Sequence, residues 1–376
     1  MLRNLFSLSC LVIHNFLKRL STVSDNQFHV KKAFQWLINA QDADETGGIS
    51  EGFHLVHGWL PPYPETTGYL IETFLDYYHQ TGNLKFKSRA LKMADWLASI
   101  QNSDGSIPDS YFKKKMVFDT GQVIFGFIRA YEETANFKYL DAAVKAGSWL
   151  LNVQEEDGTW RRFAVDNIPH TYYTRVAWSL SRLHSATGDS RYIDACLKNV
   201  KWALYRQEDN GWFNDASFNL SNHHRPFTHT IAYTMRGILE VGICTKQERF
   251  ISAVSKAADS LMPAIKQDGF VSGTYDRNWK GDESFCCLTG SAQIAIIMFK
   301  LYQLTNKNAY IETGKMINSY LKSRQQLFLN RKEVYGAIAG SWPIWGGYIH
   351  FTYPNWAAKF FVDALMIETE QKINGR

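Results

Sequence analysis

A unit of two helices repeats along the chain, and this repeat restricts the fold more than any other feature. An aromatic residue followed five positions later by glutamine closes the first half of a unit, at Trp36 with Gln41, Trp96 with Gln101, Trp149 with Gln154, Trp202 with Gln207 and Tyr320 with Gln325, and in a shifted copy at Leu261 with Gln267. A threonine followed five positions later by Phe or Tyr closes the second half, at Thr81, Thr134, Thr187, Thr245 and Thr305. These five connectors join six units.

Each unit predicts an outer helix followed by an inner helix. A glycine turn comes after the glutamine, and glycine just past a helix end supplies the left-handed cap. The second helix of each unit is apolar on nearly all sides, as in TGQVIFGFIRAY and GSAQIAIIMFKLY, so it is buried between neighbours. Its predicted starts lie near Glu65, Asp119, Tyr173, Thr228, Leu288 and Tyr353.

A closed ring buries the apolar surfaces of six such helices between neighbouring hairpins, because a single hairpin cannot bury both of its faces. We therefore predict an all-α chain, an (α/α)6 toroid with six inner helices wrapped by outer helices and almost no strand. Residues 30–376 form its single domain, and residues 1–29 form an amphipathic helix that docks on it. An open helical solenoid is the alternative, but the units lack polar capping repeats.

Composition excludes several classes of protein. The net charge of +5 is spread along the chain, which argues against a nucleic-acid partner. The apolar run at residues 5–17 is too short and polar to span a bilayer, and no small-residue cleavage site follows it. We predict a cytoplasmic rather than a periplasmic protein. The adjacent Cys286 and Cys287 have no histidine nearby to complete a zinc site, so we predict no metal and no cofactor.

The order of helices places all the long loops at one end of the ring. The outer-to-inner loops are long and aromatic, whereas the inner-to-outer connectors are short. The long loops therefore gather at the end where the inner helices start, and loops on a rigid scaffold commonly carry function. Six helix N-termini at that end also favour anions.

These repeats resemble the six-hairpin glycosidase superfamily, which includes unsaturated glucuronyl hydrolases, sugar 2-epimerases and several polysaccharide lyases. The stretches FDTGQVIFGFIRAYEET and DESFCCLTGSAQIAIIMFKLY are similar to proteins encoded with bacterial capsule and exopolysaccharide synthesis genes. The resemblance implies a carbohydrate-active enzyme of bacterial polysaccharide metabolism. Its partner would be an oligo- or polysaccharide, with uronate-containing ones among the candidates.

Two carboxylates at neighbouring inner-helix starts are the leading catalytic candidates. Glu65 lies in YPETT and Asp119 in FDTGQ, and glycoside hydrolysis needs such a pair. The resemblance adds weight to Asp119, because glucuronyl hydrolases place a catalytic aspartate near an inner-helix start. The competing interpretation is that both residues only complement the helix ends. Asp282 and Glu283, before the fifth inner helix, are a second carboxylate pair.

A cluster before the third inner helix suits lyase or epimerase chemistry instead. It contains a base and a cation that could meet a uronate carboxylate, namely His170, Tyr172, Tyr173 and Arg175. His229, at the start of the fourth inner helix, is a candidate acid or base. Arg161 could add positive charge beside Trp160.

Aromatic residues in or beside the long loops are candidates for stacking on sugar rings. They are Trp160, Trp212, Trp279, Trp342, Trp345, Tyr353 and Trp356. Hydrolysis is the leading prediction, followed by lyase or epimerase chemistry. A non-catalytic glycan-binding scaffold and a terpenoid cyclase are the alternatives from other classes. The latter rests on Gln154, Gly158 and Trp160, which match the QxxxGxW motif of triterpene cyclases.

Overall fold

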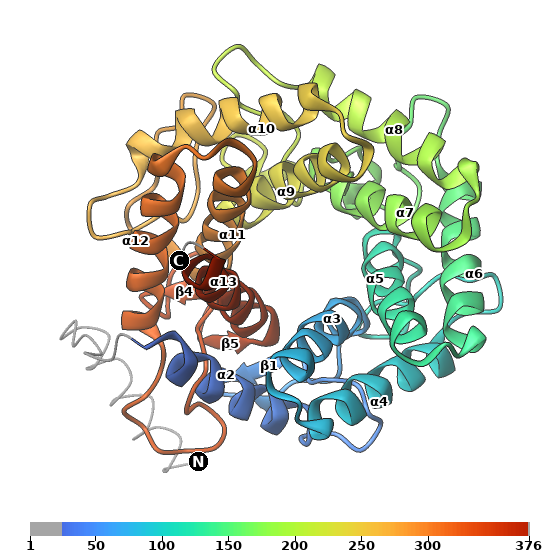
Figure 1. Ribbon diagram of the computed structural model, residues 1–376, viewed down its shortest axis with the longest axis horizontal. Helices are drawn as coiled ribbons and strands as arrows, with labels where there is room; N and C mark the ends of the chain where they lie inside the picture. Colours follow the sequence, from blue (N-terminus) through green and yellow to red (C-terminus); the bar gives the residue numbers. More distant parts are fainter. Residues whose placement is uncertain (1–24, 375–376) are drawn as a thin grey trace.

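The computed structural model describes residues 25–374, and within them the helices form two concentric rings (Figure 1). The outer ring consists of α2 (Asn26–Gln41), α4 (Leu84–Ile100), α6 (Phe137–Val153), α8 (Ser190–Tyr205), α10 (Glu248–Leu261) and α12 (Asn308–Arg324). The inner ring consists of α3 (Pro64–Thr81), α5 (Val117–Thr134), α7 (Thr174–Thr187), α9 (Thr228–Thr245), α11 (Leu288–Thr305) and α13 (Asn355–Asn374). The predicted (α/α)6 toroid is confirmed.

The repeated glutamine joins each outer helix to the next one around the ring. Gln154 donates from Nε2 to the carbonyl of Gly158 in its own turn and to the carbonyl of Ala195 in α8, both at 3.0 Å. The same pair of bonds is made by Gln41, Gln101, Gln207 and Gln325. The motif that resembles the triterpene cyclases is therefore a structural link between outer helices.

Short strands tie the long loops together, where the sequence predicted almost none. The strands β1 (Gly52–His54), β2 (Gly58–Trp59) and β5 (Thr352–Pro354) form an antiparallel sheet in the order β2-β1-β5. The strands β3 (Cys286–Cys287) and β4 (Ser341–Trp342) form a second pair. Because Phe53 pairs with Tyr353, the first sheet joins the first unit to the last and closes the ring on its loop side.

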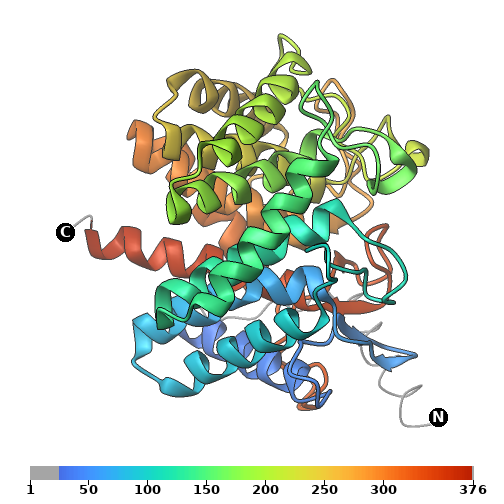
Figure 2. The ribbon, with the colours of Figure 1, turned by 90° about the vertical axis from the view of Figure 1, so that its right-hand side faces the viewer.

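The two ends of the toroid differ as predicted. Seen from the side, the long loops project from one end and the short connectors lie at the other (Figure 2). Residues 25–374 contain no helix with the length and apolar character that a membrane span requires. The predicted N-terminal helix at residues 1–29 lies almost wholly outside the described residues, and its last four belong to α2. Its docking on the domain remains a prediction.

Two glycines let the inner helices α3 and α5 approach closely. A Cβ on Gly126 would lie 2.4 Å from the carbonyl oxygen of Gly68, and a Cβ on Gly68 would lie 2.6 Å from the Cα of Val123. These are backbone atoms, so neither clash can be relieved by a rotamer change. The two helices would have to separate.

We expect Gly126→Ala to lower the free energy of unfolding by about 1–3 kcal/mol, as other overpacked cores do. Denaturant unfolding followed by circular dichroism measures the loss. Gly242→Ala in α9 is the matched control, because its Cβ would meet no atom closer than 3.0 Å. Equal losses in the two variants would contradict this account of the contact between α3 and α5.

Candidate active site

A cavity of about 290 Å³ opens among the starts of the inner helices at the loop end. We call it the upper cavity. It is slightly smaller than the range of about 300–1,000 Å³ typical of small-molecule sites, which suits a ligand the size of one sugar ring. The polar residues of its wall include Glu51, Glu65, Asp119, Tyr172, His229 and Trp356.

The first turns of α3 and α5 are held in the same way, and they carry the two central carboxyl groups. The hydroxyl of Thr67 donates to the carbonyl of Tyr63 at 2.7 Å and accepts the backbone N–H of Ile49 at 3.2 Å. Thr120 makes the equivalent bonds in the next unit, to Met116 at 2.7 Å and from Ile107 at 2.9 Å. Each returning loop is thus fixed to the start of its inner helix, two residues from Glu65 or one from Asp119.

The environment raises the pKa of both carboxyl groups, and that of Asp119 by more. Burial raises the pKa of Asp119 well above its usual range, and the negative charge of Glu65 adds to the effect. Burial raises the pKa of Glu65 to about 7, while the Tyr63 hydroxyl and the Arg175 guanidinium favour its ionised form. Asp119 does not cap its helix, and its Oδ2 is buried without a hydrogen-bond partner in the described part of the chain. A carboxyl group with a raised pKa beside a second carboxyl group is typical of an acid and base pair.

His229 is a neutral imidazole fixed in one orientation. Its Nδ1 lies 2.7 Å from Nε2 of Gln293 on α11, and its ring lies 4.2 Å from the ring of Tyr233. Burial, with a further contribution from the Arg175 charge, lowers its pKa to about 3. At neutral pH the ring is therefore uncharged and can donate a hydrogen bond through Nε2, but it is a weak base and not a general acid.

Arg175 lies beneath the upper cavity rather than in its wall. Its Nε donates to Oε1 of Gln122 at 2.6 Å. Its guanidinium carbon lies 4.9–5.5 Å from the ring centres of Tyr69, Phe125, Trp178, Tyr233 and Phe360. The expectation that it meets a substrate carboxylate at the ring mouth is therefore corrected, because Arg175 does not belong to the wall of the upper cavity, whereas Tyr69 and Tyr233, on which it packs, do.

Solved structures with the same architecture were found by comparison of folds. An unsaturated glucuronyl hydrolase described as specific for heparin superposes with a TM-score of 0.75 at 17% identity, over 93% of this chain and 98% of its own. An unsaturated glucuronyl hydrolase from a Bacillus species gives 0.74 at 11% identity, over 91% and 96%. A cellobiose 2-epimerase from Bacillus thermoamylovorans gives 0.72 at 12% identity, over 90% and 96%. The chain has the fold of the six-hairpin glycosidases.

At these identities the likeness extends to the six-hairpin fold and not to a reaction. No family model matches the chain. A comparison with curated proteins found no match either. The chemistry of this six-hairpin chain therefore has to be argued from its own side chains.

Several predicted site residues pack in the core of the six-hairpin fold. The indole N–H of Trp160 donates to the carbonyl of Leu150 at 3.0 Å, and the side chain is 1% exposed. His170 is held by the carbonyls of Ser217 at 2.9 Å and Val165 at 3.0 Å. Tyr173 is fully buried and packs edge-on against Tyr172, which does line the upper cavity. The expected contact of Trp160, His170 and Tyr173 with substrate is corrected, since packing and backbone hydrogen bonds occupy them.

Among the aromatic residues of the long loops, most pack against neighbouring residues, and Trp356 lines the upper cavity. Trp212 packs edge-on against Trp279, whose N–H donates to the carbonyl of Asn210. Tyr353 is buried within β5, and Trp342 in β4 lies under the guanidinium of Arg324. Trp345 is 38% exposed. Of the predicted aromatics outside the third unit, Trp356 lines the upper cavity, with its N–H on the Tyr348 hydroxyl at 2.9 Å.

The remaining charged candidates lie outside the upper cavity. Glu283 is exposed and pairs with Lys266 at 2.6 Å. Asp282 accepts the backbone N–H of Ser284 at 2.9 Å, in a loop turn. Arg161 pairs with Glu155 and Asp157 on the surface. The structure thus corrects the placement of these three at the ring mouth, because local partners hold each of them in its own loop.

The upper cavity also contains residues that the sequence analysis did not select. They include Glu51, Tyr63, Tyr69, Phe118, Phe218, Tyr233 and Tyr348. A helical signal for two of them was present, since Tyr69 follows Glu65 by four residues and Tyr233 follows His229 by four. Residues at that spacing share a helix face.

Proposed function

We propose that this chain is a carbohydrate-active enzyme, a glycoside hydrolase-like protein with Asp119 and Glu65 as its catalytic pair. The observation that supports this most strongly is the meeting of two carboxyl groups with raised pKa values, the buried Asp119 and the half-buried Glu65, in a cavity of about 290 Å³. Glycoside hydrolysis needs one carboxylic acid to protonate the leaving oxygen and one carboxylate as base or nucleophile.

The environments assign the roles within this proposal. Burial raises the pKa of Asp119 well above its usual range, and its Oδ2 has no hydrogen-bond partner in residues 25–374, so we assign it as the general acid. Glu65 is ionised more easily, because Arg175 and Tyr63 favour its charged form, so it is the base or nucleophile. Tyr172 and Trp356 give the cavity an aromatic wall against which the apolar face of a sugar can pack.

The wall chemistry favours a sugar without a carboxylate in the upper cavity. Among the described residues, those lining it include three acidic side chains and no Arg or Lys. A uronate would bring a further negative charge with no cation to meet it. Within the wider proposal of bacterial polysaccharide metabolism, we therefore favour a neutral sugar as the unit that enters the cavity.

Epimerase chemistry is the second candidate, and His229 is the observation that favours it. Because the amide nitrogen of Gln293 can only donate, Nδ1 of His229 accepts its hydrogen bond and Nε2 carries the ring proton. This neutral imidazole can therefore donate a hydrogen bond to a sugar oxygen while Glu65 acts as the base. Lyase chemistry has less support, because Arg175 does not reach the cavity wall. Three carboxyl groups and an imidazole are also unlike the apolar chamber expected of a terpenoid cyclase.

Incubation with bacterial polysaccharide fragments, read by mass spectrometry, separates these proposals. Hydrolysis adds the mass of water, a lyase gives an unsaturated product, and an epimerase leaves the mass unchanged while the sugar stereochemistry changes. Saturable binding without turnover across a broad panel would support the glycan-binding scaffold instead. A panel with neither binding nor turnover would count against all four.

The raised pKa of Glu65 predicts a pH-dependent effect of Glu65→Gln on stability. The unfolded glutamate ionises near pH 4, whereas the folded one holds its proton until about pH 7. Folding therefore loses stability as pH rises between these values. We expect Glu65→Gln to raise the free energy of unfolding by about 1–2 kcal/mol at pH 8 and to leave it nearly unchanged at pH 4. Urea unfolding at both pH values measures this, and an equal effect at the two would contradict the assignment.

A further inference from the structure

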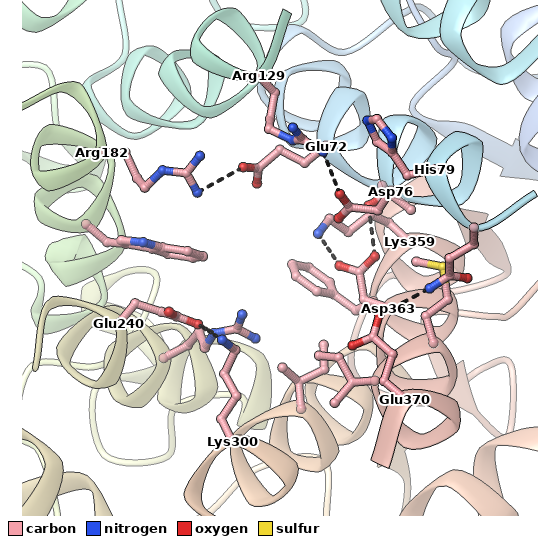
Figure 3. Close-up of a pocket in the computed structure, with 18 of the residues that line it drawn as sticks. Glu72, Asp76, His79, Arg129, Arg182, Glu240, Lys300, Lys359, Asp363 and Glu370 are labelled. Atoms are coloured by element: carbon pink, nitrogen blue, oxygen red, sulfur yellow. Dashed lines mark hydrogen bonds and ion pairs between the residues drawn. The ribbon is translucent and has the colours of Figure 1, made fainter. Parts of the chain in front are cut away.

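A second and larger cavity occupies the other end of the ring (Figure 3). It measures about 690 Å³ and lies among the inner helices, with most of its wall formed by their C-terminal halves. We call it the lower cavity. None of the proposed catalytic residues belongs to its wall. Its volume falls within the range of small-molecule sites.

Most charges around the lower cavity neutralise one another. Arg129 pairs with Asp76 at 2.9 Å, and Lys359 pairs with Asp363. Glu240 forms ion pairs with Arg236 at 2.6 Å and with Lys300 at 2.8 Å. The two positive partners lower the pKa of Glu240 to about 2 despite its burial. These pairs hold the wall together and need no ligand.

Arg175 is the exception among the basic residues of this wall. It is 3% exposed, and within residues 25–374 no carboxylate oxygen lies within ion-pair distance of it. The Nε of Arg175 donates a hydrogen bond to Gln122, while its Nη1 and Nη2 have no hydrogen-bond partner in the described chain. The five surrounding rings compensate part of its charge, but they cannot accept its remaining N–H donors in the way an anion does.

Helix α7 presents Arg175 to the lower cavity as part of a stripe. Arg175, Trp178 and Arg182 follow one another at spacings of three and four residues, so they share one face of the helix. All three line the lower cavity. Arg182 is held only loosely, since its carboxylate partners Glu72 and Glu132 both lie at 3.6 Å. A buried cation and a loosely held one therefore lie on either side of an indole.

We propose that the lower cavity is a second binding site, for a small sugar-sized molecule that carries a carboxylate or a phosphate. The oxyanion pairs with Nη1 and Nη2 of Arg175. The sugar occupies the space beside Trp178, and its hydroxyl groups reach the surrounding carboxylates. Arg182 turns from its long contacts toward the ligand.

Titration calorimetry of the full chain with glucuronate, with glucose 1-phosphate and with glucose tests this site. Saturable binding of at least one of the two anions, and at least tenfold weaker binding of glucose, is the expected result. The carboxylate and phosphate arms show which oxyanion is preferred. Failure of both anions to bind would overturn the proposal, whether or not the upper cavity is active.

Variants locate the binding event. We expect Arg175→Gln and Arg182→Glu each to weaken anion binding by at least tenfold, and Trp356→Ala, in the wall of the upper cavity, to leave it unchanged. Arg182 is partly exposed, so its variant still tests the site where Arg175→Gln does not fold. Anion binding that survives Arg182→Glu and is lost with Trp356→Ala would place the ligand in the upper cavity and overturn the proposal.

Discussion

Asp119→Asn is expected to lower kcat on a cleavable oligosaccharide by about 10²–10⁴-fold, the usual contribution of a general acid. Asparagine has nearly the shape of the protonated aspartic acid but cannot release a proton to the leaving oxygen. Because Oδ2 has no hydrogen-bond partner within the described residues, the substitution breaks no hydrogen bond at that atom. The fold and substrate binding should therefore be preserved while turnover is lost.

The measurement is the initial rate of sugar release on the substrate identified by mass, with KM and kcat determined separately. Glu283→Gln is the matched control, since it removes a carboxylate from an exposed ion pair with Lys266. A variant at Asp119 that retained kcat would exclude it as the acid. The pH profile gives an independent test, because Glu65 must be ionised and the acid limb should fall near pH 7.

The fold could be predicted from the sequence because the signals that encode it are local. Gln101, Gln154 and Gln207 each donate a hydrogen bond to a glycine carbonyl in their own turn. The sequence repeat therefore corresponds to a repeated set of hydrogen bonds in the structure. The strands were missed because they depend on partners remote in sequence. Phe53 pairs with Tyr353, and β1 is too short to carry a period-two pattern of its own.

The site was only partly predictable, and the two carboxylates show why. Glu65 and Asp119 were found because the start of an inner helix is a position that sequence can locate. The sequence could not show which of Trp160 and Trp356 lines the cavity and which packs in the core. Both follow a loop turn, yet one indole donates to the Leu150 carbonyl inside the core and the other to Tyr348 at the cavity wall. That difference depends on tertiary neighbours.

Arg175 was misplaced because the third inner segment begins early. A 3-10 turn at Thr171–Tyr173 precedes α7 and continues into it. Arg175 therefore lies more than one turn inside the ring, whereas Glu65 is the second residue of α3. No clear signal in the sequence marks that extra turn, and it moves the guanidinium from the upper cavity to the lower one.

Gln325→Ala should have the largest effect on stability, because Gln325 joins the last outer helix to the first. Its Nε2 donates to the carbonyls of His29 at 3.1 Å and Gly336 at 2.8 Å, and its Oε1 lies 2.6 Å from the Nδ1 of His29. The side chain is 4% exposed, so water does not readily replace these bonds. Loss of three buried hydrogen bonds should lower the free energy of unfolding by about 3 kcal/mol or more.

Denaturant unfolding measures this loss against two other variants. Gln35→Ala removes an exposed amide that bonds only to Asn39 within α2, and it should cost less than about 0.5 kcal/mol. Gln154→Ala removes the two equivalent bonds between α6 and α8, away from the junction of the chain ends. A greater loss for Gln325→Ala than for Gln154→Ala would assign added stability to closure of the ring. Equal losses for Gln325→Ala and Gln35→Ala would show that the sheet between β1 and β5 closes the ring without the glutamine.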